Sequence, residues 1–132
     1  MKKLLFLLLL ISASVSAQIE KVDTVINEKC YTSYYSYKIK ASAYVVYKLY
    51  KGGGNISRKG MSFKSKLPHF AYPKSGYDIG HMANAEDFAY NKELEESTFR
   101  YYNALPQTPN LNRGIWKVLE TKLERTAKKT VC

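Results

Sequence analysis

Three short motifs follow one another in the C-terminal half of the chain, and they limit what it can fold into and do. They read Tyr-Asp-Ile-Gly-His-Met at residues 77–82, Asn-Ala-Leu-Pro-Gln at 103–107 and Leu-Asn-Arg-Gly-Ile-Trp at 111–116. The first contains His81, and an imidazole with an unperturbed pKa near neutrality can take a proton from water. The third contains Asn112, whose amide oxygen can bind a divalent cation. These two residue types predict a hydrolytic site that uses one metal ion.

The N-terminus has the pattern of an export signal. Lys2 and Lys3 precede an apolar run at residues 4–11, and small side chains follow at 14–17, which is the order of a signal peptide and its cleavage site. The apolar run is shorter than the roughly 20 residues that span a bilayer. We therefore expect residues 1–17 to be removed and the mature protein to be secreted or periplasmic, without stable membrane association. An uncleaved membrane anchor is the alternative.

The rest of the chain has the size of one small domain and a strong excess of positive charge. The full sequence has 132 residues and a formal net charge of +10, so we expect residues 18–132 to form a single domain with a modest core. Such a charge attracts polyanions and favours phosphate contacts, although solubility alone also explains it. Cys30 and Cys132 either form a disulfide after export or remain free thiols. No Cys/His spacing suggests structural zinc.

The region after Cys30 predicts β-strands. Tyr, Val and Ile are dense at residues 31–50, and apolar residues alternate with Ser and Lys from 35 to 40. This period of two predicts a half-buried strand, and the apolar run at 42–49 predicts a second one. The tyrosines are either strand core, which is the favoured interpretation, or platforms that stack on bases. Residues 52–55, Gly-Gly-Gly-Asn, predict a hairpin turn and not a phosphate loop, because no Gly-Lys-Ser/Thr follows.

The following residues predict a loop and then a helix. Residues 59–76 mix Ser, Lys, Pro and Gly without periodicity, which is typical of an irregular loop. His69 lies in this loop without acidic or amide neighbours, and we assign it no role. Residues 92–102 predict a helix with acidic side chains in its first turns, where the helix dipole favours them.

A last helix begins near the third motif. Asn110 or Asn112 can cap it, and apolar side chains follow at intervals of three and four residues. Residues 112, 116 and 120 are about one turn apart, so Asn112 and Glu120 are expected on one flank. Both could then address one hydrated cation. Together the elements predict an α+β fold.

The three motifs resemble those of the DNA/RNA non-specific endonucleases, whose core is the ββα-metal, or His-Me, finger. The resemblance covers about residues 77–128. It implies an α+β fold with an antiparallel sheet and this finger, and a Mg²⁺-dependent enzyme, with Mn²⁺ as a substitute cofactor. It also implies hydrolysis of DNA and RNA phosphodiester bonds. Contacts limited to phosphate and sugar would make the cleavage indifferent to sequence.

The resemblance also implies roles for individual residues. His81 matches the general base, and Asn112 matches the single protein ligand of the metal. Glu120 matches a carboxylate that orients the water shell of the metal. Asn103 and Gln107 match amides that position the strand, the substrate or the base. The predicted sites are catalytic for His81, Glu120 and Asn103, metal-binding for Asn112, and substrate-binding for Arg58, Gln107 and Asp78.

Two features depart from the family pattern. Ile79 stands between Asp78 and Gly80, where family members commonly carry a phosphate-binding Arg. Arg58 lies in a segment, residues 56–63, that resembles the upstream strand from which the family supplies another such Arg. The sequence also stops soon after the last helix, where further strands usually follow, so the resemblance implies a minimal or a C-terminally truncated version of the fold.

Two rival interpretations remain open at this point. The first is a non-catalytic, basic nucleic-acid-binding protein on a degenerate or truncated nuclease scaffold. The second is a secreted toxin or effector nuclease, which has the same chemistry in another setting. The sequence sets neither the preferred sugar, nor the preferred strandedness, nor the oligomeric state.

Overall fold

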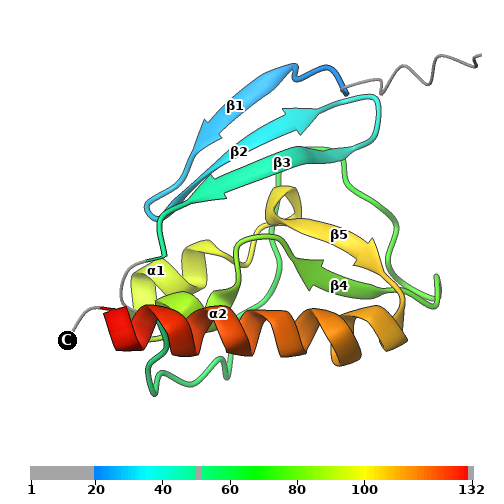
Figure 1. Ribbon diagram of the computed structural model, residues 1–132. Helices are drawn as coiled ribbons and strands as arrows, with labels where there is room; N and C mark the ends of the chain where they lie inside the picture. Colours follow the sequence, from blue (N-terminus) through cyan, green and yellow to red (C-terminus); the bar gives the residue numbers. More distant parts are fainter. Residues whose placement is uncertain (1–19, 50–51, 131–132) are drawn as a thin grey trace, which may run out of the picture.

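The computed structural model describes residues 20–49 and 52–130. An irregular segment connects two antiparallel sheets, short helices lie between the two strands of the second sheet, and a long helix ends the described chain (Figure 1). The predicted signal peptide, residues 1–17, lies outside the described residues. So does Cys132, which the predicted disulfide requires. No helix within the described ranges is both long and apolar enough to cross a bilayer.

The first sheet has three antiparallel strands in the order β1-β2-β3. They are β1 (Thr24–Asn27), β2 (Tyr31–Ser36) and β3 (Ala41–Tyr47). The two predicted strands are thus present, but the first one ends at Ser36. The prediction that its alternation continues to residue 40 is wrong, because residues 37–40 form the turn that leads into β3, with Lys40 at a φ of 53°.

The tyrosines of this sheet divide between its two faces. Tyr31 and Tyr35 are buried on the inner face, in agreement with the interpretation as strand core. Tyr34 and Tyr44 stack on the outer face with ring centroids 4.3 Å apart. The hydroxyls of Ser33 and Ser42 both bond the carbonyl oxygen of Tyr102, at 2.7 and 2.6 Å. These bonds tie the sheet to the segment that leads into the second sheet.

The segment after the first sheet crosses the molecule without regular structure. The predicted hairpin at residues 52–55 is wrong, because no strand follows it at residues 56–63. Instead, Gly54 presses against the backbone of Ala89, and a Cβ at position 54 would overlap the Ala89 carbonyl. The amide of Ile56 donates to that carbonyl oxygen at 3.1 Å. The glycine therefore serves a close backbone approach, and Arg58 comes from an irregular segment.

The second sheet pairs β4 (Asp78–His81) with β5 (Ala104–Gln107) in antiparallel register, with His81 opposite Ala104. Between the two strands lie the 3-10 helix η1 (Ala85–Phe88), the helix α1 (Lys92–Ser97) and the 3-10 helix η2 (Tyr101–Asn103). Asn91 caps α1 by accepting from two backbone amides. The helix predicted to reach residue 102 ends at Ser97, and the 3-10 helix η2 forms near the predicted end.

The final helical region has two parts, η3 (Leu111–Trp116) and α2 (Lys117–Thr130). Gly114, inside η3, has non-helical dihedral angles, φ −105° and ψ −111°, and it kinks the helical region there. The prediction of one continuous helix from Asn112 to Glu120 is therefore wrong. In Figure 1, β4 and β5 lie between α2 and the three-stranded sheet. The order β4, β5, α2 is the predicted ββα arrangement.

The main core lies between the inner face of the first sheet and the segment from β4 to α1. Tyr31, Ala83 and Phe88 are buried at its centre. The Tyr47 hydroxyl donates to buried Asp87 at 2.9 Å. This core holds in place the residues that follow His81.

Candidate active site

One cleft of about 640 Å³ brings together four of the predicted site residues, namely Arg58, His81, Asn112 and Glu120. They come from the irregular segment, from β4, from η3 and from α2. Lys117 and Ile79 also line the cleft. The predicted common flank of one helix does not exist, but the kink at Gly114 still leaves Asn112 and Glu120 on the same cleft.

His81 lies at the end of β4 between two aromatic rings. Its ring centroid is 4.7 Å from that of Phe63 and 4.8 Å from that of Phe99. The Nε2 atom is buried and has no hydrogen-bond partner. Burial, and then the charge of Arg58, lowers the pKa of the imidazole to about 3. The ring is therefore neutral at physiological pH, and its Nε2 atom is closed to water.

Asn103 holds the backbone just after His81. Its side chain is fully buried, and Oδ1 accepts from the Ala83 amide at 2.8 Å. The Nδ2 atom donates to the carbonyl oxygens of Ala83, at 3.0 Å, and Thr98, at 2.9 Å. The amide is thus occupied on both ends by backbone groups. Asn103 is not among the residues that line the cleft.

Asp78 fixes the orientation of the Asn112 side chain. Its Oδ2 atom accepts from Asn112 Nδ2 at 3.0 Å, and Arg113 binds both carboxylate oxygens, at 2.8 and 2.7 Å. The hydrogen bonds from Arg113, and then from Asn112, lower the pKa of Asp78. Because its nitrogen is held in this way, Asn112 keeps its oxygen available, and no described residue hydrogen-bonds that oxygen. Asp78 itself does not line the cleft.

Gln107 lies on β5, next to the strand β4 that carries His81, and is paired with Asp78. A Cβ at Gly80 would overlap the Gln107 side-chain amide, so only glycine fits at position 80 without displacing it. Gln107 is buried, and its Oε1 atom has no hydrogen-bond partner. Like Asn103, it is outside the residues that line the cleft. Gly80 of the first motif and Gln107 of the second therefore pack against each other on the paired strands.

Arg58 is held in the cleft by two carboxylates. Its Nη2 atom is 2.6 Å from Glu86 Oε1, and its Nε atom is 3.4 Å from Glu95 Oε1. Glu95 is fully buried and neither oxygen has a hydrogen bond. Burial raises the pKa of Glu95, and the Arg58 charge opposes that shift. Sequence reasoning missed Glu95, because in the sequence nothing distinguishes it from its exposed neighbour Glu93.

Glu120 projects from the first turn of α2. Burial raises the pKa of its carboxyl, and the charge of Asp87 adds to the shift. Across the described residues, no group of three or more His, Cys, Asp and Glu side chains forms a metal-binding cluster. Asn84, Glu86 and Glu124 also line the cleft, but Asn84 accepts from a backbone amide, Glu86 pairs with Arg58 and Glu124 pairs with Lys128. The oxygen donors that remain are the Asn112 amide and the Glu120 carboxylate. Such a set suits a cation that keeps most of its water, as Mg²⁺ does.

The comparisons with known proteins identify the family of the chain. The family model of the DNA/RNA non-specific endonucleases matches residues 12–132. The chain therefore belongs to this family, and the resemblance inferred from the three motifs is confirmed. The α+β fold with antiparallel sheets is confirmed as well, by the similarity to a solved structure described next.

The chain is similar to proteins that are longer than itself. It is 45% identical over 49 residues to a nuclease of Nostoc sp., covering 37% of this chain and 18% of that protein. It is 37% identical over 59 residues to mitochondrial endonuclease G of Bos taurus, covering 45% of this chain and 19% of that protein. The chain thus spans about a fifth of the length of these curated relatives.

Among solved structures, the chain is similar to one from the complex of EndoG with EndoGI, a study of EndoG inhibition. The TM-score is 0.74 at 26% sequence identity. The match covers 82% of this chain and 49% of the other chain. The similarity therefore includes most of the described fold but only half of the relative.

Proposed function

We propose that the protein is a Mg²⁺-dependent endonuclease that hydrolyses DNA and RNA phosphodiester bonds without sequence preference. The observation that supports this most is the shared cleft, which is lined by the neutral imidazole of His81 and by the side chain of Asn112. Family membership supplies the class of substrate. Export from the cell remains a prediction from residues 1–17.

His81 acts in this proposal as the general base. Its ring is neutral, because burial and Arg58 hold its pKa near 3 in the free protein. A phosphate group in the cleft brings negative charge close to the ring, and that charge raises the pKa. The base therefore gains strength when substrate is present. The attacking water would approach Nδ1, because Nε2 is buried.

Asn112 would hold the metal ion through its amide oxygen, and Glu120 would accept hydrogen bonds from the water of the ion. The fit is supported by Asp78, which binds the Asn112 nitrogen and so directs the oxygen away from itself. When bound, Mg²⁺ or its substitute Mn²⁺ would stabilise the negative charge that develops on the phosphate and on the leaving oxygen.

Cations of the chain would bind the phosphate groups of the substrate. Arg58 and Lys117 line the cleft, and Ile79 occupies the position where the family pattern has Arg. Arg58 is paired with Glu86 and Glu95 in the free protein, so a phosphate has to compete with these carboxylates. Contacts of this kind address the backbone and not the bases, which agrees with cleavage at any sequence.

The test is digestion of supercoiled plasmid and of RNA by the purified protein, with Mg²⁺ and with chelator. We expect cleavage that requires the metal. His81→Ala should lower the rate by at least about 100-fold, the usual contribution of a general base. His69→Ala is the matched control, because His69 lies outside the cleft and stacks on Tyr101. Undiminished metal-dependent cleavage by His81→Ala would refute the role of the base.

A second candidate function is favoured by Ile79. An apolar side chain in the cleft at that position removes one cation, and the net charge of +10 still supports nucleic-acid binding. The protein would then bind nucleic acid without cutting it. Binding that persists in chelator, with no cleavage when Mg²⁺ is restored, would favour this function over the first.

A further inference from the structure

The outward side of α2 carries a row of cations that the candidate site does not use. Lys122, Arg125 and Lys129 line a shallow groove of about 600 Å³ together with Lys117. None of the four forms an ion pair within the described part of the chain. By contrast, Arg113 is paired with Asp78 and Lys128 with Glu124.

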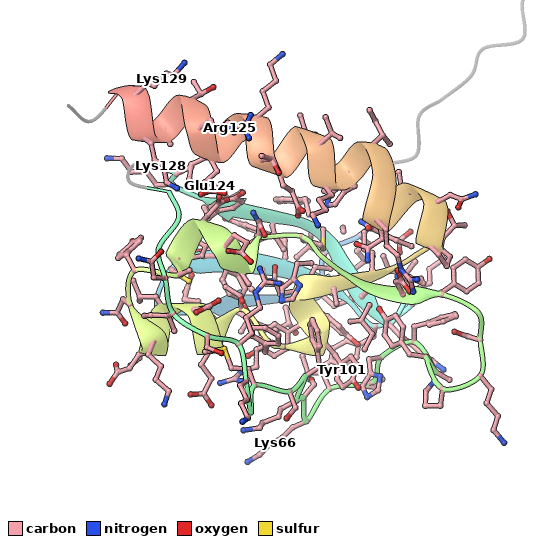
Figure 2. The ribbon with its side chains drawn as sticks, turned by 90° about the horizontal axis from the view of Figure 1, so that it is seen from below. Lys66, Tyr101, Glu124, Arg125, Lys128 and Lys129 are labelled. Carbon is pink, nitrogen blue, oxygen red and sulfur yellow. The ribbon has the colours of Figure 1, made fainter. Side chains whose placement is uncertain are left out.

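The carboxylates of α2 face the other way. Glu120 and Glu124 line the cleft, whereas no acidic residue lines the groove. In Figure 2, Glu124 and Lys128 lie on the side of α2 that is turned toward the rest of the molecule, and Lys129 lies on the opposite side. The outward side is therefore positively charged along its length, with no charge of opposite sign to neutralise it.

The groove and the cleft form one continuous surface. Arg113, Lys117 and Thr121 line both of them. Lys117, Thr121, Arg125 and Lys129 follow at intervals of four residues, so they extend along a single flank of the helix. A chain bound in the cleft can therefore continue along α2 without leaving the basic surface.

We propose that this groove binds the backbone of the nucleic acid on one side of the scissile phosphate. We call Lys122, Arg125 and Lys129 the α2 track. As the extension of a substrate site, the track rests on the proposed function. Lys117 and Lys129 are separated by about 18 Å along the helix axis at 1.5 Å per residue. That length corresponds to about five base pairs of duplex at 3.4 Å each.

The track explains how a site with one cation fewer can still hold its substrate. Each Lys or Arg that neutralises a phosphate releases counterions, and this release drives binding at low salt. Thr121 and Thr126 also line the groove, but their hydroxyls donate to the carbonyl oxygens of Lys117 and Lys122, so the cations supply the donors to a phosphate. Nothing in the groove is arranged to distinguish one base from another, so the track binds any sequence.

The test measures binding without cleavage. A fluorescent duplex and a fluorescent single strand are titrated in chelator at several salt concentrations, with the wild type and with the triple variant Lys122→Gln, Arg125→Gln and Lys129→Gln. The matched control removes the same charge elsewhere, by Lys48→Gln, Lys66→Gln and Lys92→Gln. All six side chains are exposed, and Lys66 lies at the edge of the molecule opposite to α2 (Figure 2). Circular dichroism should show equal folding of the three proteins, since Gln has a helix propensity close to that of Lys and Arg.

The α2 track variant should lose at least about tenfold in affinity at low salt. Its slope of log K against log salt should become shallower by about 2.7 on duplex, or by about 2 on single strands. The control variant should change the slope by less than about 1. Equal changes in both variants, or an unchanged slope in the track variant, would overturn the proposal.

Anionic vesicles are the second arm of the experiment, because a membrane is the other polyanion that such a helix can bind. Loss of vesicle binding with unchanged nucleic-acid binding would overturn the proposal too. Cleavage by the wild type is measured separately with Mg²⁺. If the wild type does not cut, the proposed function fails, while the binding data in chelator still decide for or against the track.

Discussion

The two walls of the cleft are built in different ways. The wall that carries His81 is fixed by buried groups, since Asn103 binds the backbone after it and Gln107 packs on Gly80 before it. The wall formed by η3 and α2 buries little. Ile115 is 68% exposed and Val118 is 62% exposed, and Asn112 is held by the Asp78 carboxylate. The base is thus part of the core, whereas the metal-binding side is attached mainly through polar contacts.

This difference predicts that substitutions in the two walls have different consequences. Changes behind His81 should affect folding first, because the groups they expose are buried. Changes in η3 and α2 should leave folding nearly unaltered and should act on metal and nucleic-acid binding. The two walls can therefore be compared by the loss of stability that each substitution causes.

Among the substitutions in the two walls, Asn103→Ala should have the largest effect on stability at neutral pH. It leaves the amide and the carbonyl oxygen of Ala83 without partners in a buried position, and it removes one of the two hydrogen bonds to the Thr98 carbonyl oxygen, which keeps its bond from the Arg100 amide. At about 1 kcal/mol or more for each orphaned group, we expect a loss of about 2–3 kcal/mol in the free energy of unfolding. Urea denaturation measures it. Asn112→Ala is the control in the other wall, and it should cost less than about 1 kcal/mol. Equal losses in the two variants would contradict the comparison.

Gly80→Ala should cost about 1–3 kcal/mol, the usual range for an overpacked site. The added methyl overlaps the Gln107 side chain. A second substitution, Gln107→Ala, removes the overlapping atoms, so the double variant should recover part of the loss. A double-mutant cycle measures this coupling. Purely additive effects would show that the contact between these two side chains is not what requires glycine.

The pH dependence of stability should contain a contribution from His81. The folded pKa is about 3 and the ordinary pKa of a histidine is 6.5, so between these values the unfolded chain binds a proton that the folded chain does not. The free energy of unfolding should therefore fall as the pH drops from 6.5 toward 3, by up to about 1.4 kcal/mol per pH unit. The measurement is the difference between wild type and His81→Gln across this range.

Other groups work in the opposite direction. Burial raises the pKa of Asp87, Glu95 and Glu120, and a raised carboxyl pKa gives stability that is lost as the pH rises. The comparison of variants cancels these contributions. His69→Gln serves as the control for removing an imidazole. An identical pH profile for wild type and His81→Gln would show that the ring is not buried as described.

Ile115→Ala should have the smallest effect, below about 0.5 kcal/mol, because the side chain is 68% exposed. Phe88→Ala is the contrasting substitution in the core, where about 3–5 kcal/mol is expected. Thermal denaturation of the two variants measures the difference. A cost of several kcal/mol for Ile115→Ala would mean that this face of η3 is covered in the folded protein.

Four of the seven predicted site residues, namely His81, Asn112, Glu120 and Arg58, line one cleft, whereas Asp78, Asn103 and Gln107 do not. The roles of all seven stay predictions. The four could be found because each motif combines a reactive side chain with residues that only a particular backbone geometry requires. Gly80, for example, is required because the Gln107 side chain packs directly against its Cα position.

The remaining features depend on contacts between distant residues. The hydrogen bond from Asn112 to Asp78 joins positions 34 residues apart, and no local pattern indicates it. The burial of Glu95 is likewise set by tertiary packing. The glycines at 52–54 resembled a hairpin turn, but Gly54 serves its approach to the Ala89 backbone. The helix predicted through Asn112 is interrupted at Gly114, because the conformational freedom of glycine permits a kink that the apolar spacing alone does not reveal.

The proposed function requires that one metal ion bound through Asn112 lies in the same cleft as the His81 ring. Mn²⁺ tests it most directly, because a bound paramagnetic ion broadens the NMR signals of nearby protons. With sub-stoichiometric Mn²⁺, we expect strong broadening of the His81 ring signals and little broadening of the His69 ring signals. In the Asn112→Ala variant, this difference between the two rings should disappear. Equal broadening of the two rings, or broadening of His81 that persists in Asn112→Ala, would contradict it.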